Sequence, residues 1–191
     1  MTVFASLPRF GADVMDGDGR AIPDSRLQGL ARYWFDRCAE GDVPPRTAID
    51  PLEFPALLPN ILLLDRVVTP EGVRFRYRLV GTQVVEIAGR ELTGCFLDEA
   101  LPPSYADFVA QTHRLALERR RPVYASSLYH DKGNFVNGLT YRLVMPLRRA
   151  GDEPDTVFVC QFWQRRSDNG HWTGDWRSVK PEITVIVSPE G

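Results

Sequence analysis

Residues 75–100 read FRYRLVGTQVVEIAGRELTGCFLDEA, and this stretch decides the fold that the rest of the sequence predicts. Its first five residues alternate apolar and basic side chains, which is the pattern of a β-strand with one buried face. Gly81 ends that strand, and residues 83–88 have the apolar spacing of a short amphipathic helix. A second glycine, Gly89, interrupts the helical pattern before another short helical segment. The stretch therefore predicts a strand that leads directly into short helices lying over a sheet.

The sequence on either side of this stretch predicts two groups of strands. Residues 61–68 are mostly apolar, and a turn around residues 70–72 joins them to the strand at residues 74–80. A connection this short makes the pair an antiparallel hairpin. A long amphipathic helix is expected at residues 104–119. Three more strands are expected after it, at residues 123–130, 137–148 and 156–166. Two groups of antiparallel strands with helices between them predict an α+β fold.

Another amphipathic helix is predicted near the N-terminus. Leu27, Leu30 and Trp34 recur at three- and four-residue steps, with Phe35 beside them, so they share one side of a helix. Trp34 and Phe35 are large for an isolated surface helix. This side of the helix therefore packs either on the sheet of the same chain or against a second subunit, which makes the same four residues the candidate dimer interface.

The remaining segments predict extensions around one domain. Residues 1–26 contain the turn-forming sequence DGDG and little periodicity, which is typical of a flexible arm. Five prolines within residues 42–60 exclude a long helix or a central strand there and predict a rigid connector. The domain itself is expected at residues 27–166, followed by a C-terminal extension at residues 167–191. The β-rich segment 183–187 of that extension predicts either an added strand or a docking segment for a partner.

Composition and charge limit the classes of function. The 191 residues are enough for one domain whose core needs no disulfide or metal. Basic and acidic residues number 23 and 25, and this balance argues against nucleic-acid binding through a basic surface. The three cysteines are widely spaced and form no CxxC pair, which is typical of reduced thiols. Because we find no signal-peptide pattern and no apolar run long enough to span a bilayer, we expect a cytoplasmic protein with no membrane partner.

Three segments together resemble the PAS domain family. They are LLLDRVVTPEGVRFRYRLVGT at residues 62–82, GRELTGCFLDEAL at residues 89–101 and VFVCQFWQRR at residues 157–166. The helix LARYWFD and the connector from Asp50-Pro51 to Leu58-Pro59 narrow the resemblance to stand-alone bacterial PAS proteins of the kind common in alphaproteobacteria. The resemblance covers about residues 27–166. It implies a PAS-like five-stranded antiparallel sheet, strand order 2-1-5-4-3, with helices on one face and an N-terminal amphipathic helix before it.

The same resemblance implies a function. PAS domains bind small molecules or protein partners and usually have no chemistry of their own. We therefore expect a non-enzymatic sensory or regulatory module for signal transduction, which binds an unidentified small apolar or amphipathic ligand and signals through an unidentified protein partner. The cavity is expected between the sheet and the helices, with Tyr77, Tyr141 and Arg142 as its polar groups. The residues expected to line it are Phe75, Tyr77, Leu79, Phe108, Leu115, Tyr141, Arg142, Leu143 and Met145.

Two alternatives stay open. In the first, the core is filled, and the protein is an interaction domain that forms a homodimer through its N-terminal helix and binds no ligand. In the second, His113 on the long helix binds haem and the protein is a haem-based sensor. No other cofactor and no metal is expected, because no two histidines have metal-binding spacing. No catalytic residue is predicted, since the sequence has no GxSxG, P-loop or GxGxxG motif.

Overall fold

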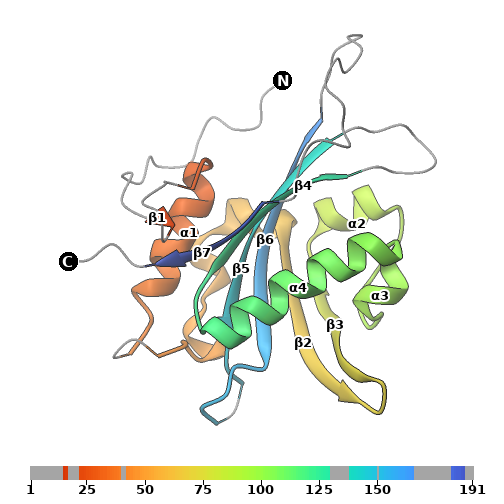
Figure 1. Ribbon diagram of the computed structural model, residues 1–191. Coiled ribbons are helices and arrows are strands. Elements are labelled where there is room, and N and C mark those ends of the chain that lie inside the picture. The colour runs from red at the N-terminus through yellow and green to blue at the C-terminus, as the bar shows by residue number, and fades with distance from the viewer. Residues whose placement is uncertain are drawn as a thin grey trace.

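The computed structural model describes residues 15–16, 22–39, 42–129, 138–149, 151–165 and 182–187 (Figure 1). Its helices are α1 (Ser25–Phe35), α2 (Thr82–Ala88), α3 (Leu97–Ala100) and α4 (Pro103–Arg119), and its 3₁₀ helices are η1 (Arg46–Ala48), η2 (Pro51–Glu53) and η3 (Pro55–Asn60). Its strands are β1 (Met15–Asp16), β2 (Ile61–Thr69), β3 (Gly72–Val80), β4 (Val123–Tyr129), β5 (Gly138–Leu147), β6 (Thr156–Arg165) and β7 (Glu182–Val187). The helices and strands predicted from the sequence are therefore present, each within a few residues of its expected bounds.

The described strands form one antiparallel sheet in the order β1-β7-β4-β5-β6-β2-β3. The five strands β3-β2-β6-β5-β4 have the predicted order 2-1-5-4-3 when they are numbered in chain order among themselves, which confirms the predicted fold. Beyond them, β7 pairs with β4, with Val185 opposite Val123, and β1 pairs with β7. The segment that was expected either to add a strand or to dock on a partner therefore adds a strand to the sheet.

Helices cover both faces of the sheet. α2, α3 and α4 pack on one face, called the inner face here, and Figure 1 shows α4 running across it. α1 and η3 pack on the opposite, outer face. In the middle of β5, Leu143, Val144 and Met145 are all fully buried although they point alternately to the two faces. The helices predicted for one face thus cover the inner face, while the N-terminal helix covers the outer one.

α1 is fixed to the outer face near both of its ends. At its beginning the carboxylate of Asp24 caps the helix by accepting a hydrogen bond from the N–H of Arg26 at 2.9 Å. The guanidinium of Arg26 also donates to the hydroxyl of Tyr141 on β5, at 3.2 Å. Near its other end Nε1 of Trp34 donates to the carbonyl oxygen of Pro146, also on β5, at 2.8 Å. α1 and β5 are therefore joined by directed hydrogen bonds as well as by apolar packing.

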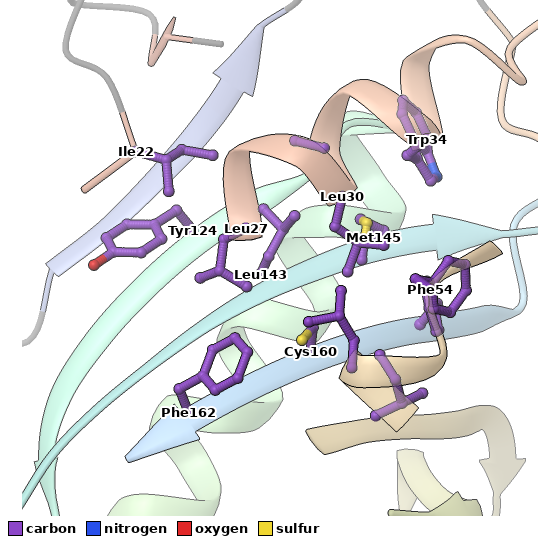
Figure 2. Close-up of a cluster of buried hydrophobic side chains, with 14 of the residues drawn as sticks. Ile22, Leu27, Leu30, Trp34, Phe54, Tyr124, Leu143, Met145, Cys160 and Phe162 are labelled. Atoms are coloured by element: carbon purple, nitrogen blue, oxygen red, sulfur yellow. The ribbon is translucent and has the colours of Figure 1, made fainter. Parts of the chain in front are cut away.

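The packing of α1 distinguishes the two interpretations of its apolar side. Leu27, Leu30 and Trp34 are at most 3% exposed and lie over β5 and β6 in the outer-face cluster that Figure 2 shows. Phe35 is partly buried beside Trp34, with the ring centroids 5.1 Å apart. This side of the helix therefore packs on the sheet of the same chain and leaves Leu27, Leu30 and Trp34 almost no surface for a second subunit. Dimerisation of the protein stays a prediction.

The four residues of β5 that were predicted to line the cavity are divided between the two faces of the sheet. Tyr141, Leu143 and Met145 lie on the outer face beneath α1, whereas Arg142 and Val144 lie on the inner face. The prediction that the first three residues face the cavity was therefore wrong. Helices cover β5 on both sides, so the more apolar set of side chains does not mark the side of the cavity.

A β-bulge changes the direction of side chains at the end of β3. Leu64 of β2 pairs with Tyr77, whereas Leu63 pairs with Leu79, so the register shifts between these two pairs. Phe75 and Tyr77 are buried on the inner face, but Leu79 turns to the outer side of the sheet edge and is 47% exposed. The prediction that Leu79 shares the face of Phe75 and Tyr77 was wrong because the bulge inserts one extra residue.

η3 passes very close to the beginning of α2 at Gly81. The N–H of Gly81 donates to the carbonyl oxygen of Ile61 at 2.7 Å. A Cβ atom placed on Gly81 would lie 2.5 Å from the carbonyl oxygen of Leu58 and closer still to that of Pro59. The φ angle of Gly81 is −66°, which any residue can adopt. Glycine is therefore required here for the close approach of two backbone segments.

The three cysteines are free thiols. Burial raises the pKa of Cys160, which lies in the outer-face cluster, and it also raises the pKa of Cys38 to about 11. Both thiols are therefore protonated at neutral pH. Among the described helices, none is long and apolar enough to cross a membrane.

Candidate functional site

A cavity of about 60 Å³ lies between the inner face of the sheet and the helices α2 and α4. A buried water molecule, which has one non-hydrogen atom, needs about 10–15 Å³ of cavity volume. The cavity therefore has room for about four to six non-hydrogen atoms. Its apolar walls come from β2, α2, α4 and β6 and include Leu62, Val84, Val109 and Val159. Its polar side chains are Tyr77, Tyr105, His113, Arg142 and Gln161. Mostly apolar walls with a few polar groups are typical of a small-molecule site.

Arg142 is at the centre of the polar part of this cavity. Its side chain leaves the inner face of β5 directly opposite Gln161 of β6. One guanidinium nitrogen, Nη2, donates a hydrogen bond to the hydroxyl of Tyr105 on α4. His113 and Tyr77 are close enough for the charge of Arg142 to act on both of them. The other four polar side chains of the cavity are therefore all neighbours of one guanidinium group.

Arg142 is buried and has no counter-ion among the described residues. The residue is 2% exposed, and within the described part of the chain no carboxylate forms an ion pair with it. Its Nε is buried and has no hydrogen-bond partner among the described residues. Buried charges in proteins are usually paired, because removing an ion from water costs several kcal/mol. An unpaired cation on the wall of a cavity is therefore a candidate anion-binding group.

His113 reaches the cavity from α4 as a neutral ring. It is 2% exposed, and its ring meets the ring of Phe75 nearly edge-on with the centroids 5.0 Å apart. Burial, together with the positive charges of Arg142 and Arg114, lowers the pKa of His113 to about 3. Its Nδ1 has no hydrogen-bond partner in the described structure. At neutral pH the cavity wall, as far as the described residues form it, thus carries a single charge, that of Arg142.

Tyr77 closes the cavity on the side of β3. Its backbone N–H donates to the carbonyl oxygen of Cys95 at 3.0 Å, and its own carbonyl oxygen accepts from the N–H of Gly94 at 2.7 Å. These bonds hold the segment between α2 and α3 along the edge of β3. Burial raises the pKa of the Tyr77 phenol to about 12, against the opposing effect of Arg142. Tyr77 therefore presents a neutral hydroxyl at physiological pH.

Two buried hydroxyl groups extend the polar surface beyond the cavity wall. Thr140 precedes Arg142 by two residues on β5, and Ser127 lies opposite Thr140 on β4. The two residues are 0% and 4% exposed, and neither hydroxyl has a hydrogen-bond partner among the described residues. A buried hydroxyl without a partner costs about 1–3 kcal/mol. The inner face therefore combines an apolar region with a polar region centred on Arg142.

The low pKa of His113 predicts that the protein loses stability in mild acid. The unfolded chain binds a proton at His113 below about pH 6.5, whereas the folded protein does so only near pH 3. Between these two values the unfolded state binds more protons, so the free energy of unfolding should fall by about 1.4 kcal/mol for each unit of decrease in pH. Urea unfolding of the native protein and of His113→Leu, from neutral pH down to about pH 5, measures this slope. The carboxylates are common to both proteins, and equal slopes would contradict a neutral, buried His113.

The structure brings together only part of the set of residues predicted to line the cavity. Tyr77 and Arg142 are on its wall, and their role in ligand binding stays a prediction. Phe75 is buried on the same face, but it packs against His113 outside the wall. Leu79 and the three predicted residues of the outer face of β5 point away from the cavity. The residues of β3 that face the helices were thus predicted correctly up to the bulge, whereas in β5 only Arg142 was predicted on the correct face.

Phe108 and Leu115 lie on the flanks of α4 and not above the cavity. Val109 and His113 form the side of the helix that lines it, whereas Phe108 and Leu115 are only partly buried and do not line it. Each residue turns an α-helix by about 100°, so a neighbour of a wall residue points to the side. The prediction that Phe108 and Leu115 close the cavity was therefore wrong, because Phe108 is one position from the wall residue Val109 and Leu115 is two positions from His113.

Tyr105, Gln161 and Trp163 line the cavity although they were not among the predicted residues. The sequence does contain one signal for Gln161, because it is the single polar residue in the apolar run VFVCQFW at residues 157–163. A polar residue in such a run indicates a place where polar groups meet inside the protein. That Arg142 lies opposite Gln161 could not be predicted from either strand alone, because it depends on the pairing of β5 with β6.

The fold and the cavity define a class of protein, an α+β domain whose helices enclose a small site against one face of an antiparallel sheet. A family model described as PAS domain matches residues 23–161, which is most of the chain, and the chain belongs to the PAS domain family. PAS domains are generally sensory or regulatory modules without enzymatic activity. Comparisons with curated proteins and with solved structures gave no match.

The cavity does not fit the haem alternative. His113 lines it, but a volume of about 60 Å³ is far below the roughly 300–1,000 Å³ of pockets that enclose ligands of such size. The imidazole is also packed against Phe75 and would have to move to present a nitrogen to iron. In the described ranges no three His, Cys, Asp or Glu side chains are grouped so that they could hold a metal ion.

Proposed function

We propose that this PAS domain is a sensor that binds a small amphipathic molecule in the cavity beneath α2 and α4 and passes the signal to a protein partner. One observation carries the proposal: the cavity has apolar walls on several sides and neutral polar groups arranged around one buried cation, Arg142. A filled core would not need a charge at this position, because a protein with an apolar side chain of similar volume there is often at least as stable as one with a buried ion.

The dimensions of the cavity limit the ligand. Room for about four to six non-hydrogen atoms admits a small metabolite or the end of a longer one. The apolar side chains of Leu62, Val84 and Val109 would contact its hydrocarbon part, and each CH₂ group buried there contributes about 0.8 kcal/mol. The polar residues would fix its orientation, as in other small-molecule sites.

Filling the cavity should weaken ligand binding strongly without changing the fold. Val109 is 3% exposed and lines the cavity from α4, so Val109→Phe places additional atoms in the space that a ligand would occupy. We expect small molecules found in a metabolite screen by ligand-observed NMR to bind at least about 10-fold more weakly to this variant, since overpacking excludes them sterically. Val84→Phe fills the same space from α2 and provides an independent repeat.

Leu115→Phe is the matched control, because it adds an aromatic ring to the same helix at a partly buried site outside the cavity. Binding to this control should equal binding to the native protein. A ligand that binds Val109→Phe and Val84→Phe as tightly as the native protein would show that it binds elsewhere. If nothing in the screen binds the native protein, the result supports the alternative of an interaction domain with a filled core. Sedimentation velocity then tests whether the protein forms a homodimer.

A further inference from the structure

The cation in the cavity differs from four other arginines that bridge elements of the fold. Arg37, Arg74, Arg120 and Arg149 are each at least 22% exposed in their side chains, and each forms an ion pair with an Asp or Glu. Arg142 is 2% exposed and has no such pair among the described residues, although an ion pair matters far more in the interior than at the surface. A guanidinium cannot release its proton in a protein. The charge of Arg142 is therefore permanent, and an anion is the chemical group that would complement it.

The hydrogen-bonding geometry of Arg142 specifies the kind of anion. A guanidinium has five N–H donors in one plane, and only the bond from Nη2 to Tyr105 is formed with a described residue in the cavity. The buried Nε–H has no acceptor in the part of the chain that the structure describes. Two adjacent N–H groups of a guanidinium match the two oxygens of a carboxylate, and such bidentate bonds are shorter and stronger than neutral ones. The donor that lacks a partner thus belongs to a group suited to bind a planar carboxylate.

The neighbours of Arg142 limit the charge of that anion to one unit. His113, with a pKa of about 3, adds no positive charge at neutral pH. Tyr77, with a pKa of about 12, and Gln161 are also neutral, so they can donate hydrogen bonds but cannot balance a second negative charge. An ion with two negative charges, such as phosphate at neutral pH, would leave one of them unpaired in a buried site. A monoanion is favoured.

The size and the walls of the cavity define the remainder of the molecule. Three atoms of a carboxylate group leave room for about one to three carbon atoms within the four to six that the volume admits. Val84, Val109 and Val159 supply apolar surface for those carbons. We propose that the cavity binds a short-chain aliphatic monocarboxylate and that Arg142 pairs with its carboxylate. This rests on the proposed function, because it names the class of ligand for the same cavity.

The proposal is tested by comparing butyrate with a neutral ligand of equal shape and with two ligands of different charge. The probes are butyrate, butyramide, butylamine and inorganic phosphate, each titrated into the full chain by isothermal titration calorimetry or by ligand-observed NMR. Butyrate should bind at least 10-fold more tightly than butyramide, because only the carboxylate pairs with the buried charge. Butylamine and phosphate should show no binding. This comparison uses the native protein and does not depend on the folding of any variant.

Arg142→Met keeps a long side chain but removes the charge and all five donors. Butyrate should bind this variant at least 100-fold more weakly, which is the effect of losing a charge-assisted bidentate contact. Arg142→Lys keeps the charge without the planar fork and should bind butyrate with intermediate affinity. Arg114→Met is the matched control, because Arg114 is an exposed arginine of α4 beside His113 that does not line the cavity. Its affinity for butyrate should equal that of the native protein.

The outcomes separate this inference from the proposed function. Equal binding of butyrate and butyramide, both lost in Val109→Phe, would overturn the carboxylate assignment and leave a ligand-binding cavity in place. Failure of butyrate to bind, while other small molecules from the screen bind and are excluded by Val109→Phe, would have the same meaning. Butyrate binding that survives in Arg142→Met at native affinity would also overturn the assignment, because the carboxylate would then contact another group.

Discussion

Replacing Trp34 by alanine is expected to lower the free energy of unfolding by about 3–5 kcal/mol, the usual cost of removing a fully buried aromatic side chain. Trp34 is 0% exposed and stands at the end of α1 where the helix meets β5. The substitution removes its packing in the outer-face cluster and leaves the carbonyl oxygen of Pro146 without its 2.8 Å hydrogen bond. Urea unfolding followed by far-ultraviolet circular dichroism measures the loss, because other tryptophans in the chain complicate fluorescence.

Two further variants serve as comparisons for Trp34→Ala. Trp34→Phe keeps most of the ring but not the N–H donor, so it should cost about 1–2 kcal/mol less than alanine does. Leu52→Ala changes a side chain that is 80% exposed and should alter stability by no more than about 0.5 kcal/mol. A loss below about 1 kcal/mol for Trp34→Ala would mean that α1 does not depend on packing against its own sheet. The combination of unchanged stability with dissociation of a dimer would support the alternative of an interface through α1.

Replacing Gly81 by alanine is expected to destabilise the protein by about 3 kcal/mol or more, at the upper end of the cost of overpacking. The added Cβ would lie 2.5 Å from the carbonyl oxygen of Leu58 and still closer to that of Pro59. Both atoms belong to the backbone of η3 and cannot rotate away as the end of a side chain could. Relief would require η3 to separate from the beginning of α2. The same urea experiment measures the change, and heteronuclear NMR spectra would place it at these two elements.

Gly151→Ala is the control for Gly81→Ala. Gly151 has a φ of 77°, and a Cβ there would meet no atom within 4 Å, so the substitution introduces only backbone strain of about 1–2 kcal/mol. Backbone angles alone predict the opposite order, because Gly81 has an ordinary φ of −66°. A smaller loss of stability for Gly81→Ala than for Gly151→Ala would contradict this prediction, because it would mean that η3 and α2 separate at little cost.

The positions of the strands and helices could be predicted from the sequence because local signals define them. The alternation at residues 75–79 and the short turn before it indicate a hairpin without any knowledge of tertiary contacts. The spacing of Leu27, Leu30 and Trp34 likewise predicts a helix with one apolar side. The resemblance to PAS domains then supplied the strand order that these local signals leave open. What the helix packs against could not be read from its own sequence, because a sheet and a second subunit offer the same apolar surface.

The site was predicted less completely, since it depends on which face of each strand the helices cover. In β5 the set Tyr141, Leu143 and Met145 is more apolar than the set with Arg142 between them, and apolarity normally marks the buried face. With helices on both faces, the apolar set packs beneath α1, and Arg142 from the other set lines the cavity. The bulge that turns Leu79 outward is likewise a property of the pairing of two strands, which neither strand specifies alone.

The location of β5 between the cavity and α1 has a mechanical consequence. Tyr141 and Arg142 are consecutive residues, joined by one planar and stiff peptide unit, yet they project from opposite faces of the sheet. Any backbone displacement at Arg142 therefore also moves Tyr141, whose hydroxyl is bonded to Arg26 at the beginning of α1. Close-packed interiors transmit such strain over short distances. A displacement that begins at the cavity therefore reaches α1 through a single peptide unit of β5.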